Sequence, residues 1–303
     1  MGKIAILLIG FNRTDFLIDR INELRNIKLP IYISMDGPTP QYDRSREEED
    51  RIFRSSQSLF DPSLIFHKTN LGLANHLPVM LSKLFSKFEW IIVIEDDISV
   101  PEINLASLIN QIKENPIDEL LILGLFSFIG GRCFEFLPNS WRTSCYFNGW
   151  GWATNRITWS KYEGNLMNRD IEQTLINSKK WLELTRSKRR FWKLKFEKIS
   201  KYPNLSWDYQ VQYMIFLHEI NVRRPIFRAS ENLGFFDSRG TNLKGPKPKW
   251  YIGSTTDREI KGEIESQYLI KLLNFFDSNT WIMDGKCIKL IASIFKKLKY
   301  LSK

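Results

Sequence analysis

Short apolar segments alternate with helical patterns through the first third of the chain, and this alternation restricts the fold more than any other feature of the sequence. Ile4 to Ile9 and Trp90 to Ile94 are uninterrupted apolar runs, which are typical of strands buried on both faces of a sheet. Shorter strands are expected at Ile31 to Ser34 and at about Leu64 to His67. The segments between them have helical patterns: one begins with Thr14 as its N-cap, and two others run over about Arg44 to Ser56 and about Ala74 to Phe85. Strands that alternate with single helices indicate an α/β fold with a mostly parallel, twisted, Rossmann-like sheet and helices on both faces.

The pattern changes in the second half of the chain. A strand over Leu120 to Gly124 leads into a stretch rich in tryptophan and glycine, Trp141 to Trp159. The remaining elements are expected in this order: helices around Asp170 to Thr185 and Trp207 to His218, a strand over Asn221 to Phe227, a mobile loop over Gly234 to Gly245, a linker at Pro246-Lys247-Pro248, and a helical extension from about Glu263.

Composition excludes several classes of protein. Hydrophobic residues make up 43% of the chain and charged residues 26%, which are values of globular proteins and exclude disorder of the whole chain. The longest apolar candidate, Leu120 to Ile129, is too short to span a membrane and is expected to be a buried strand. We see no signal peptide, and Cys133, Cys145 and Cys287 are too few for a disulfide framework. A reduced, cytoplasmic protein with buried free thiols is therefore expected, although Cys133 and Cys145 could pair in an oxidising compartment.

The net charge of +10 is concentrated in two stretches. Arg186 to Lys201 holds eight basic residues and one acid, and Lys286 to Lys303 holds six lysines and no acid. The rest of the chain is nearly neutral, which argues against a protein wrapped in nucleic acid and favours local contact with something anionic. Apolar residues recur at helical spacing in Lys286 to Lys303, so we expect an amphipathic helix that either holds the protein at the inner face of an anionic membrane or docks on the domain.

Three acids, Glu95-Asp96-Asp97, directly follow the buried strand Trp90 to Ile94. Adjacent carboxylates repel one another, so a compensating cation is expected. Hard oxygen ligands suit Mn²⁺ or Mg²⁺, and such an ion can bridge to a diphosphate that the acids alone would repel. An acidic turn that faces solvent is the alternative.

Two other expected strands also end in polar residues, Asn12-Arg13 and Asp36-Gly37. Ligands of open α/β sheets bind outside the carboxyl ends of the strands, so these residues are expected near the three acids. The forked, permanently charged guanidinium of Arg13 suits a phosphate. Asp36 is either a ligand contact or a plain turn residue, because Asp-Gly-Pro is turn chemistry by itself.

The order of these motifs resembles that of GT-A-fold glycosyltransferases, and most of all the N-acetylglucosaminyltransferase I type and its bacterial relatives. The resemblance covers about Lys3 to Asn242. Five segments carry it, each similar to a family motif: Gly10-Phe11-Asn12-Arg13-Thr14, Ser34-Met35-Asp36-Gly37, Glu95-Asp96-Asp97, Gly149-Trp150-Gly151-Trp152, and Trp207-Asp208 with Arg224-Pro225. Two departures are Trp150, where the family has leucine, and the helix around Asn75-His76, which aligns only loosely.

The resemblance implies a metal-dependent, inverting transferase that uses a nucleotide-sugar donor, with UDP as the nucleotide and N-acetylglucosamine as one candidate sugar. Residues 1–100 would form the nucleotide-sugar-binding part of a GT-A domain, residues 101–245 its acceptor-binding and catalytic part, and residues 246–303 a linker and basic helical extension. The acceptor would be a glycan or a lipid-linked glycan, as in polysaccharide biosynthesis.

The resemblance also implies roles for the acids. Asp97 would bind the metal directly, Asp96 would contact the ribose or the metal, and Glu95 would orient the site. Asp36 would contact the uracil. Asp208 would be the general base that inverting sugar transfer requires, with Glu163 and Asp237 as alternatives; an ordinary acid at a helix start is the other interpretation of Asp208.

Further candidates come from the loop and from the aromatic residues. In the loop Gly234 to Gly245, which we expect to close over the donor, Arg239 or Asn242 would touch the diphosphate. Trp152 is the preferred sugar platform, with Trp141 and Trp150 as further candidates, although such residues are more often core. His67, His76 and His218 show no metal-ligand spacing and are expected to be structural.

Two other functions remain open. Sugar-nucleotide pyrophosphorylases have a similar sheet, but they carry a glycine-rich basic loop after the first strand, and Gly10 to Arg13 lacks that richness. A basic module that binds nucleic acid or a membrane surface would use Arg189-Arg190-Phe191-Trp192-Lys193, but it leaves the three acids unexplained.

Overall fold

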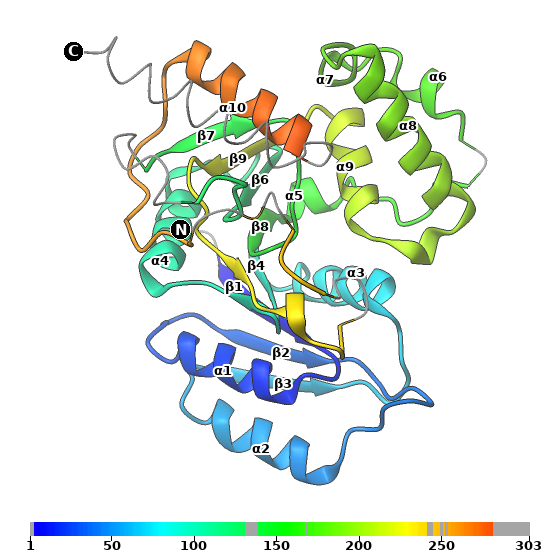
Figure 1. Ribbon diagram of the computed structural model, residues 1–303. Helices are drawn as coiled ribbons and strands as arrows, with labels where there is room; N and C mark the ends of the chain where they lie inside the picture. The colour runs from blue at the N-terminus through cyan, green and yellow to red at the C-terminus, as the bar shows by residue number, and fades with distance from the viewer. Residues whose placement is uncertain are drawn as a thin grey trace.

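The computed structural model describes residues 3–130, 139–167, 169–240, 245–248, 251 and 254–280, and it is built on one eight-stranded sheet (Figure 1). The strand order is β3-β2-β1-β4-β8-β6-β9-β7. The strands are β1 (Ile4–Gly10), β2 (Ile31–Met35), β3 (Pro62–Phe66), β4 (Trp90–Glu95), β6 (Leu121–Gly124), β7 (Trp141–Ser144), β8 (Trp152–Asn155) and β9 (Asn221–Pro225). β1 to β4 pair in parallel and so do β6 and β9, whereas β8 is antiparallel to β4 and β6, and β7 to β9. The predicted mostly parallel α/β sheet is confirmed.

Helices cover both faces of the sheet because its central strands are apolar on both sides. In β1, Ile4, Ile6 and Leu8 belong to one core cluster, and Ala5 and Leu7 belong to the other. The helices of the first cluster are α1 (Thr14–Leu24), α2 (Arg46–Ser56) and α4 (Glu102–Glu114), and those of the second are α3 (Leu73–Leu84), α5 (Arg156–Trp159) and α9 (Asp208–Leu217). Burial on both faces explains why β1 is an uninterrupted apolar run in the sequence.

The prediction that Thr14 caps α1 is wrong. Arg13 occupies the N-cap position without a side-chain cap bond, and Thr14 is the first helical residue. The Thr14 hydroxyl donates instead to Glu48 Oε1 at 3.0 Å, which joins α1 to α2. Arginine has no acceptor for the first amides of a helix, so the Arg13 side chain is used elsewhere.

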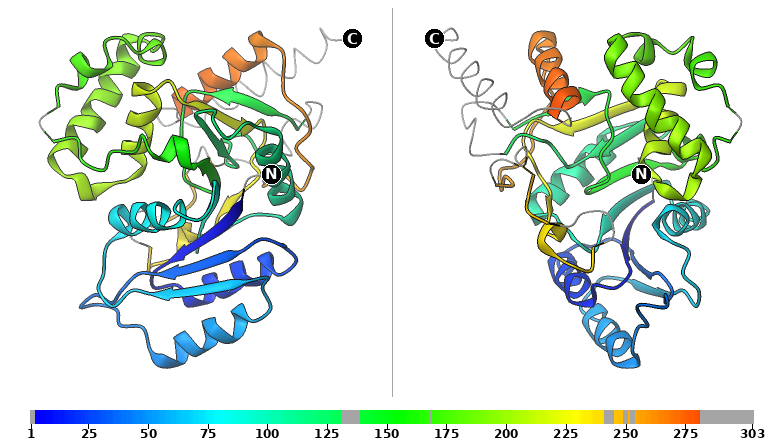
Figure 2. Two further views of the ribbon diagram at one scale, coloured as in Figure 1. Left: turned by 180° about the vertical axis from the view of Figure 1, so that it is seen from behind. Right: turned by 45° about the vertical axis from the view of Figure 1, so that its right-hand side comes forward.

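A helical lobe stands beyond α9, away from α1 and α2 (Figures 1 and 2). We define it as α6 (Ile171–Leu175), α7 (Lys179–Leu182) and α8 (Arg186–Lys201). Its own apolar cluster packs Trp181, Trp192 and Phe196 against Tyr213 and Phe216 of α9. The lobe is therefore anchored on the helix that begins at Asp208.

The helical region predicted around Asp170 to Thr185 is divided into two short helices. Asp170 accepts a hydrogen bond from the Gln173 amide at 3.1 Å and caps α6. Ser178 accepts one from the Trp181 amide at 3.1 Å and caps α7. Each cap starts a new helix, because it satisfies amides that a continuing helix would bond itself.

The predicted C-terminal extension contains α10 (Gln267–Thr280), which packs on β7. Asp277 of α10 forms ion pairs with Arg142 Nη1 at 2.8 Å and with Arg224 Nη1 at 3.1 Å, and all three side chains are buried. Burial alone would raise the pKa of Asp277, but the two guanidinium groups hold it below its ordinary value. The helix predicted for Lys286 to Lys303 lies outside the described residues. Within the described ranges, no helix combines the length and the apolar character needed to cross a bilayer.

We expect Asp277→Ala to lower the free energy of unfolding by about 3–5 kcal/mol, because it leaves two buried arginines without their carboxylate. The control is Glu259→Ala, which removes an exposed pair with Lys261 (Glu259 Oε2 to Lys261 Nζ, 3.1 Å). That change should cost less than about 1 kcal/mol. Urea denaturation near neutral pH measures both, and equal small losses would show that α10 does not depend on this ion pair.

Candidate functional site

The acids after β4 and the polar residues after β1 meet at the carboxyl edge of the sheet. Ile9 of β1 is paired with Glu95 of β4, and the Asp96 amide donates to the Ile9 carbonyl at 2.9 Å. Because the two strands are parallel neighbours, Arg13 arrives at the same edge as Asp96 and Asp97. The convergence expected from the sequence is present.

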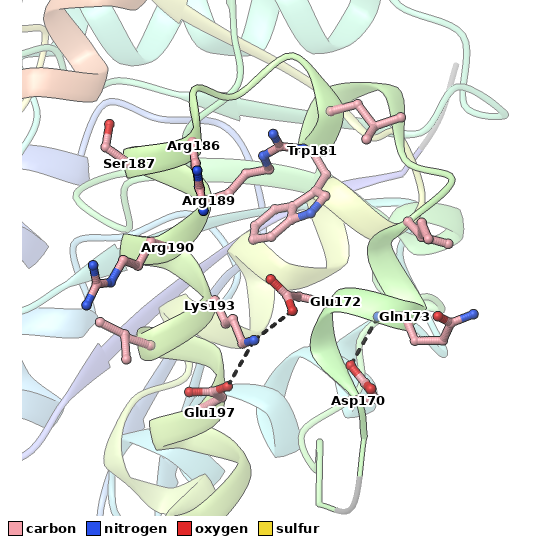
Figure 3. Close-up of a pocket in the computed structure, with 13 residues that line it drawn as sticks. Asp170, Glu172, Gln173, Trp181, Arg186, Ser187, Arg189, Arg190, Lys193 and Glu197 are labelled. Atoms are coloured by element: carbon pink, nitrogen blue, oxygen red, sulfur yellow. Dashed lines mark hydrogen bonds and ion pairs between the residues drawn. The ribbon is translucent and has the colours of Figure 1, made fainter.

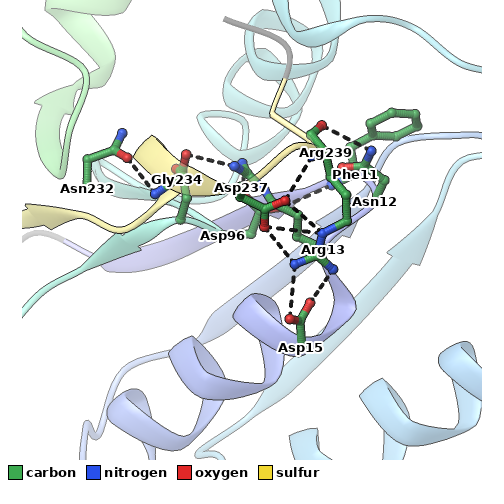
Figure 4. Close-up of polar contacts among 10 residues, drawn as sticks. Phe11, Asn12, Arg13, Asp15, Asp96, Asn232, Gly234, Asp237 and Arg239 are labelled. Carbon is green, nitrogen blue, oxygen red and sulfur yellow. Dashed lines mark hydrogen bonds and ion pairs between the residues drawn. The ribbon is translucent and has the colours of Figure 1, made fainter. Parts of the chain in front are cut away.

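Arg13 bridges Asp96 and Asp97, and Figure 4 labels Arg13 and Asp96 at this edge. Its Nη1 donates to Asp97 Oδ2 at 2.9 Å, and its Nη2 donates to Asp96 Oδ1. The Phe11 amide also donates to Asp96 Oδ2, at 3.4 Å. One guanidinium therefore compensates two buried carboxylates.

This compensation is incomplete, because the acids remain difficult to ionise. Burial raises the pKa of Asp96 to about 6, and the Arg13 charge opposes a larger rise. Burial also raises the pKa of Asp97, again against Arg13. Burial raises the pKa of Glu95 well above its ordinary value, and the charges of Asp97 and Asp96 add to this rise. A further cation would lower all three pKa values.

A divalent metal fits this edge in part. Asp97 Oδ1 is buried and has no hydrogen-bond partner, so it is an acceptor open to a cation. Over the residues that the structure describes, however, no three His, Cys, Asp or Glu side chains gather into a complete metal site. Mg²⁺ and similar ions are often held by one or two carboxylates and by substrate phosphates and water. The donor set suits that arrangement, with Asp97 as the direct ligand.

The chain segment after β10 crosses directly over Asp97. β5 (Ile98–Ser99) pairs antiparallel with β10 (Glu231–Asn232), so the residues that follow β10 lie beside Asp97, which precedes β5. The Leu233 amide donates to the Asp97 carbonyl at 2.8 Å. A Cβ atom at Gly234 would lie 2.5 Å from Asp97 Oδ2 and 3.0 Å from Arg13 Nη1. Only glycine allows the backbone to approach the acid so closely.

Arg239 closes this segment onto α1 (Figure 4). Its Nη1 and Nη2 donate to Asp15 at 2.7 and 3.0 Å, and its Nη2 donates to Asp237 Oδ2 at 2.6 Å. The Asn12 side-chain amide donates to the Arg239 carbonyl at 3.3 Å. Arg239 thus lies near the acids, as the sequence suggests, but its guanidinium faces carboxylates in this state. Asn242 lies outside the described residues.

Asp208 is the first residue of α9, and its charge contributes to the raised pKa of Glu95. Its Oδ1 accepts hydrogen bonds from the Tyr209 amide at 2.9 Å and from the Ser206 hydroxyl. Burial raises the pKa of Asp208 to about 6, against the opposing effects of the Tyr209 amide and the Lys195 charge. A carboxylate with this pKa is ionised at neutral pH and still accepts a proton readily.

The two alternative bases are engaged by arginines. Glu163 forms an ion pair with Arg169 at the surface. Asp237 is bound by Arg239, and this hydrogen bond lowers the pKa of Asp237. Because Arg239 lowers the pKa of Asp237, this carboxylate is a weaker proton acceptor than Asp208.

Asp36 is buried, and its carboxylate organises the turn after β3. It accepts hydrogen bonds from the backbone amides of Gly37, Leu71 and Gly72 at 2.8–2.9 Å and from the Asn70 side chain at 3.3 Å. A uracil contact of the kind that the resemblance implies would have to share these oxygens.

Trp152 lies in the core and presents no surface on which a sugar could stack. Its ring is fully buried on β8 and is stacked on Trp207 with 5.6 Å between ring centroids. Trp141 is also buried. Trp150 is half-buried and meets Phe126 edge to face at 4.5 Å, so it alone among the three tryptophans named from the sequence retains some exposure.

The histidines and the described cysteine have structural surroundings. His67 and His76 both contact the Ser34 hydroxyl, at 3.3 and 2.7 Å. Burial lowers the pKa of His76 to about 4, so this ring is neutral at physiological pH. Cys145 is a free thiol whose pKa burial raises. Cys133 and Cys287 lie outside the described residues.

The sequence alone does not identify three residues of this region, namely Asp15, Lys195 and Tyr162. Asp15 binds Arg239, and Lys195 and Tyr162 lie close enough to Asp208 to interact with it electrostatically. The Tyr162 hydroxyl is buried without a hydrogen-bond partner, and its ring is stacked on Trp159 at 4.3 Å. Asp15 directly follows the motif Gly10 to Thr14, so its position in the sequence could have predicted a place at the site. The local sequence around Lys195 and Tyr162 gives no such indication.

Comparisons with known proteins give only distant matches. No protein-family model matches the chain, and no curated protein sequence matches it. Similar solved structures include a mannosyltransferase from Pyrobaculum calidifontis in complex with GDP-Man and Mn²⁺, at 15% identity and a TM-score of 0.39 over 51% of this chain and 45% of that chain. Another is mannose-1-phosphate geranyltransferase from Thermus thermophilus, at 10% identity and a TM-score of 0.38 over 77% of each chain. The match thus spans less than half the length of the mannosyltransferase, and the class of the fold is defined by the strand order and pairing given above.

Proposed function

We propose that this protein is a metal-dependent, inverting glycosyltransferase that moves a sugar from a nucleotide-diphosphate donor to a hydroxyl of a glycan or lipid-linked acceptor. The observation that carries the proposal is the meeting of Arg13, Asp96 and Asp97 at the carboxyl edge of β1 and β4, where the charge of Asp208 also adds to the raised pKa of Glu95. Uridine is the proposed nucleotide, on the resemblance of the sequence motifs to the N-acetylglucosaminyltransferase I type.

The roles proposed for the donor side follow from the contacts. Asp97 would hold Mn²⁺ or Mg²⁺ through its unpartnered Oδ1, and Asp96 would bind the metal or the donor ribose. The metal, when bound, stabilises negative charge on the departing diphosphate. Arg13 would bind a phosphate when a metal takes its place as the partner of the two aspartates. Glu95 would hold the neighbouring acids in position without binding the metal itself.

The diphosphate would lie under the segment that crosses Asp97. Asn12 already contacts the Arg239 backbone, and Arg239 belongs to that segment, which supports a role for Arg239 in covering the donor. Asp36 is proposed to contact the base through the turn that it organises. For Trp152, burial supports a role in positioning the neighbouring Trp207 and Asp208 rather than in stacking on a sugar.

Asp208 is the proposed general base. It would take the proton of the acceptor hydroxyl while the acceptor oxygen bonds to the anomeric carbon and the bond from that carbon to the diphosphate oxygen breaks. The attack comes from the face opposite the leaving group, which inverts the anomeric configuration. Burial, which raises the pKa of Asp208, and the engagement of Glu163 and Asp237 by arginines support this choice.

A thermal-shift panel of nucleotide sugars, each with and without Mn²⁺, tests the proposed function. A donor that binds only the native state should raise the melting temperature, and it should do so only with the metal present. Release of nucleoside diphosphate supports transfer or hydrolysis, whereas formation of pyrophosphate from a nucleoside triphosphate and a sugar phosphate would identify a pyrophosphorylase instead. A flat panel would reject nucleotide-sugar binding.

We expect Asp208→Asn to lower kcat by about 100-fold or more with little change in donor affinity, as for the loss of a general base. Since Asp208 must be ionised to accept a proton, wild-type kcat should fall as the pH drops below about 6, the value to which burial raises its pKa. The variant should lose this acid limb. Glu163→Gln is the matched control and should keep both rate and limb; a kcat loss confined to Glu163→Gln would assign the base there.

A further inference from the structure

The helical lobe carries an open depression that is separate from the acids at the sheet edge (Figure 3). Its volume is about 1340 Å³, and α6, α7 and α8 form its walls. None of the residues proposed above for donor binding or catalysis lines it. The proposed transferase reaction therefore assigns no role to this depression.

The charges of this surface do not cancel. Lys193 is paired with Glu172 Oε2 at 2.7 Å and with Glu197 Oε1 at 3.8 Å. Asp170, the third acid of the depression, caps α6 through the Gln173 amide. Each of the three acids therefore has a partner, although Lys193 is the only one of these partners that carries a positive charge.

Three arginines are left over, Arg186, Arg189 and Arg190, from the first turns of α8. Figure 3 shows them apart from the linked group of Lys193, Glu172 and Glu197. Within the described part of the chain no ion pair engages any of the three arginines. The four basic and three acidic side chains of the depression sum to a net charge of +1, and the three arginines that no acid pairs with are the groups that match an anionic partner.

Apolar side chains stand on the same surface and face solvent. Ile176, Leu182 and Leu194 are 51%, 52% and 58% exposed, and they come from the walls of the depression. Leu182 ends α7 and Leu194 lies on α8, while the buried stripe of α8 points the other way, toward α9. Exposed leucine and isoleucine beside unpaired arginine is the pattern of a surface that enters the boundary between lipid headgroups and acyl chains.

We propose that the helical lobe is a docking surface for an anionic phospholipid membrane. Arg186, Arg189 and Arg190 bind headgroup phosphates, and Leu182 and Leu194 enter the interface beside them. The proposal is independent of the reaction catalysed at the sheet edge. The proposed membrane contact is formed by α7 and α8, and it does not depend on the helix predicted for Lys286 to Lys303.

Nucleic acid fits this surface less well. Trp192, the central aromatic residue of the basic and aromatic run on α8, is buried and is stacked on Tyr146 with 6.1 Å between centroids. Trp181 at the base of the depression is buried as well. A binder of single strands needs accessible rings for the bases, and these rings belong to the core of the lobe.

Vesicle flotation of the full chain tests the proposal, with vesicles of phosphatidylcholine alone or mixed with phosphatidylglycerol. The triple variant Arg186→Gln, Arg189→Gln, Arg190→Gln should lower partition onto anionic vesicles by about tenfold or more. The matched control replaces three exposed arginines of α2, Arg46→Gln, Arg51→Gln and Arg54→Gln, with the same change in net charge. It should change partition by less than about twofold, because α2 lies far from the lobe in Figure 1.

The apolar contribution has its own pair of variants. Leu182→Ser with Leu194→Ser should weaken partition at a salt concentration that screens the arginines, whereas Phe53→Ser on α2, at a side chain that is 54% exposed, should not. Circular dichroism melting checks that each variant is folded. Equal binding by the wild type and the arginine variant, equal losses in both triple variants, or binding to a soluble polyanion but not to vesicles would each overturn the proposal.

Discussion

The compensation of charge at the end of β4 is the constraint on which the site depends. A strand buried on both faces delivers three carboxylates to one edge of the sheet, and a single arginine from the end of β1 binds two of them. Burial still raises the pKa values of all three acids, so the edge favours a further cation. The backbone of Gly234 packs closely against Asp97, and Arg239 forms an ion pair with Asp15; these two contacts hold the segment that covers this edge.

The sequence predicts the sheet well because its signal is local. β1 is apolar at every position since successive residues face two different cores, and the polar residues that follow β1 and β4 must share an edge in a parallel sheet. The side-chain partners are not local. Arg13 and Asp96 are 83 residues apart, and Arg239 and Asp15 are 224 apart, so no periodicity or turn signal joins them. Trp152 shows the same limit, since its motif suggested a ligand contact and its neighbours bury it completely.

In the helical lobe and in α10, the charged residues of the sequence do not by themselves predict the packing that the structure shows. α8 is a regular helix whose inner stripe is Trp192, Phe196 and Ile199, but its many basic residues suggested a binding patch rather than a helix. Asp277 is an ordinary acid in the sequence, and only the fold reveals that it forms ion pairs with two buried arginines. α9 joins the helical lobe to the site, because it begins at Asp208 and packs against α8.

The most direct test of the charge account is the affinity for Mn²⁺, measured by electron paramagnetic resonance of the free ion with and without a nucleoside diphosphate. One free carboxylate oxygen and an arginine across the site predict weak binding of Mn²⁺ alone and much tighter binding when phosphates complete the coordination. Asp97→Asn should abolish the tight binding, whereas Asp170→Asn on the helical lobe should leave it unchanged. Tight binding that needs no nucleotide, or that survives Asp97→Asn, would contradict the account.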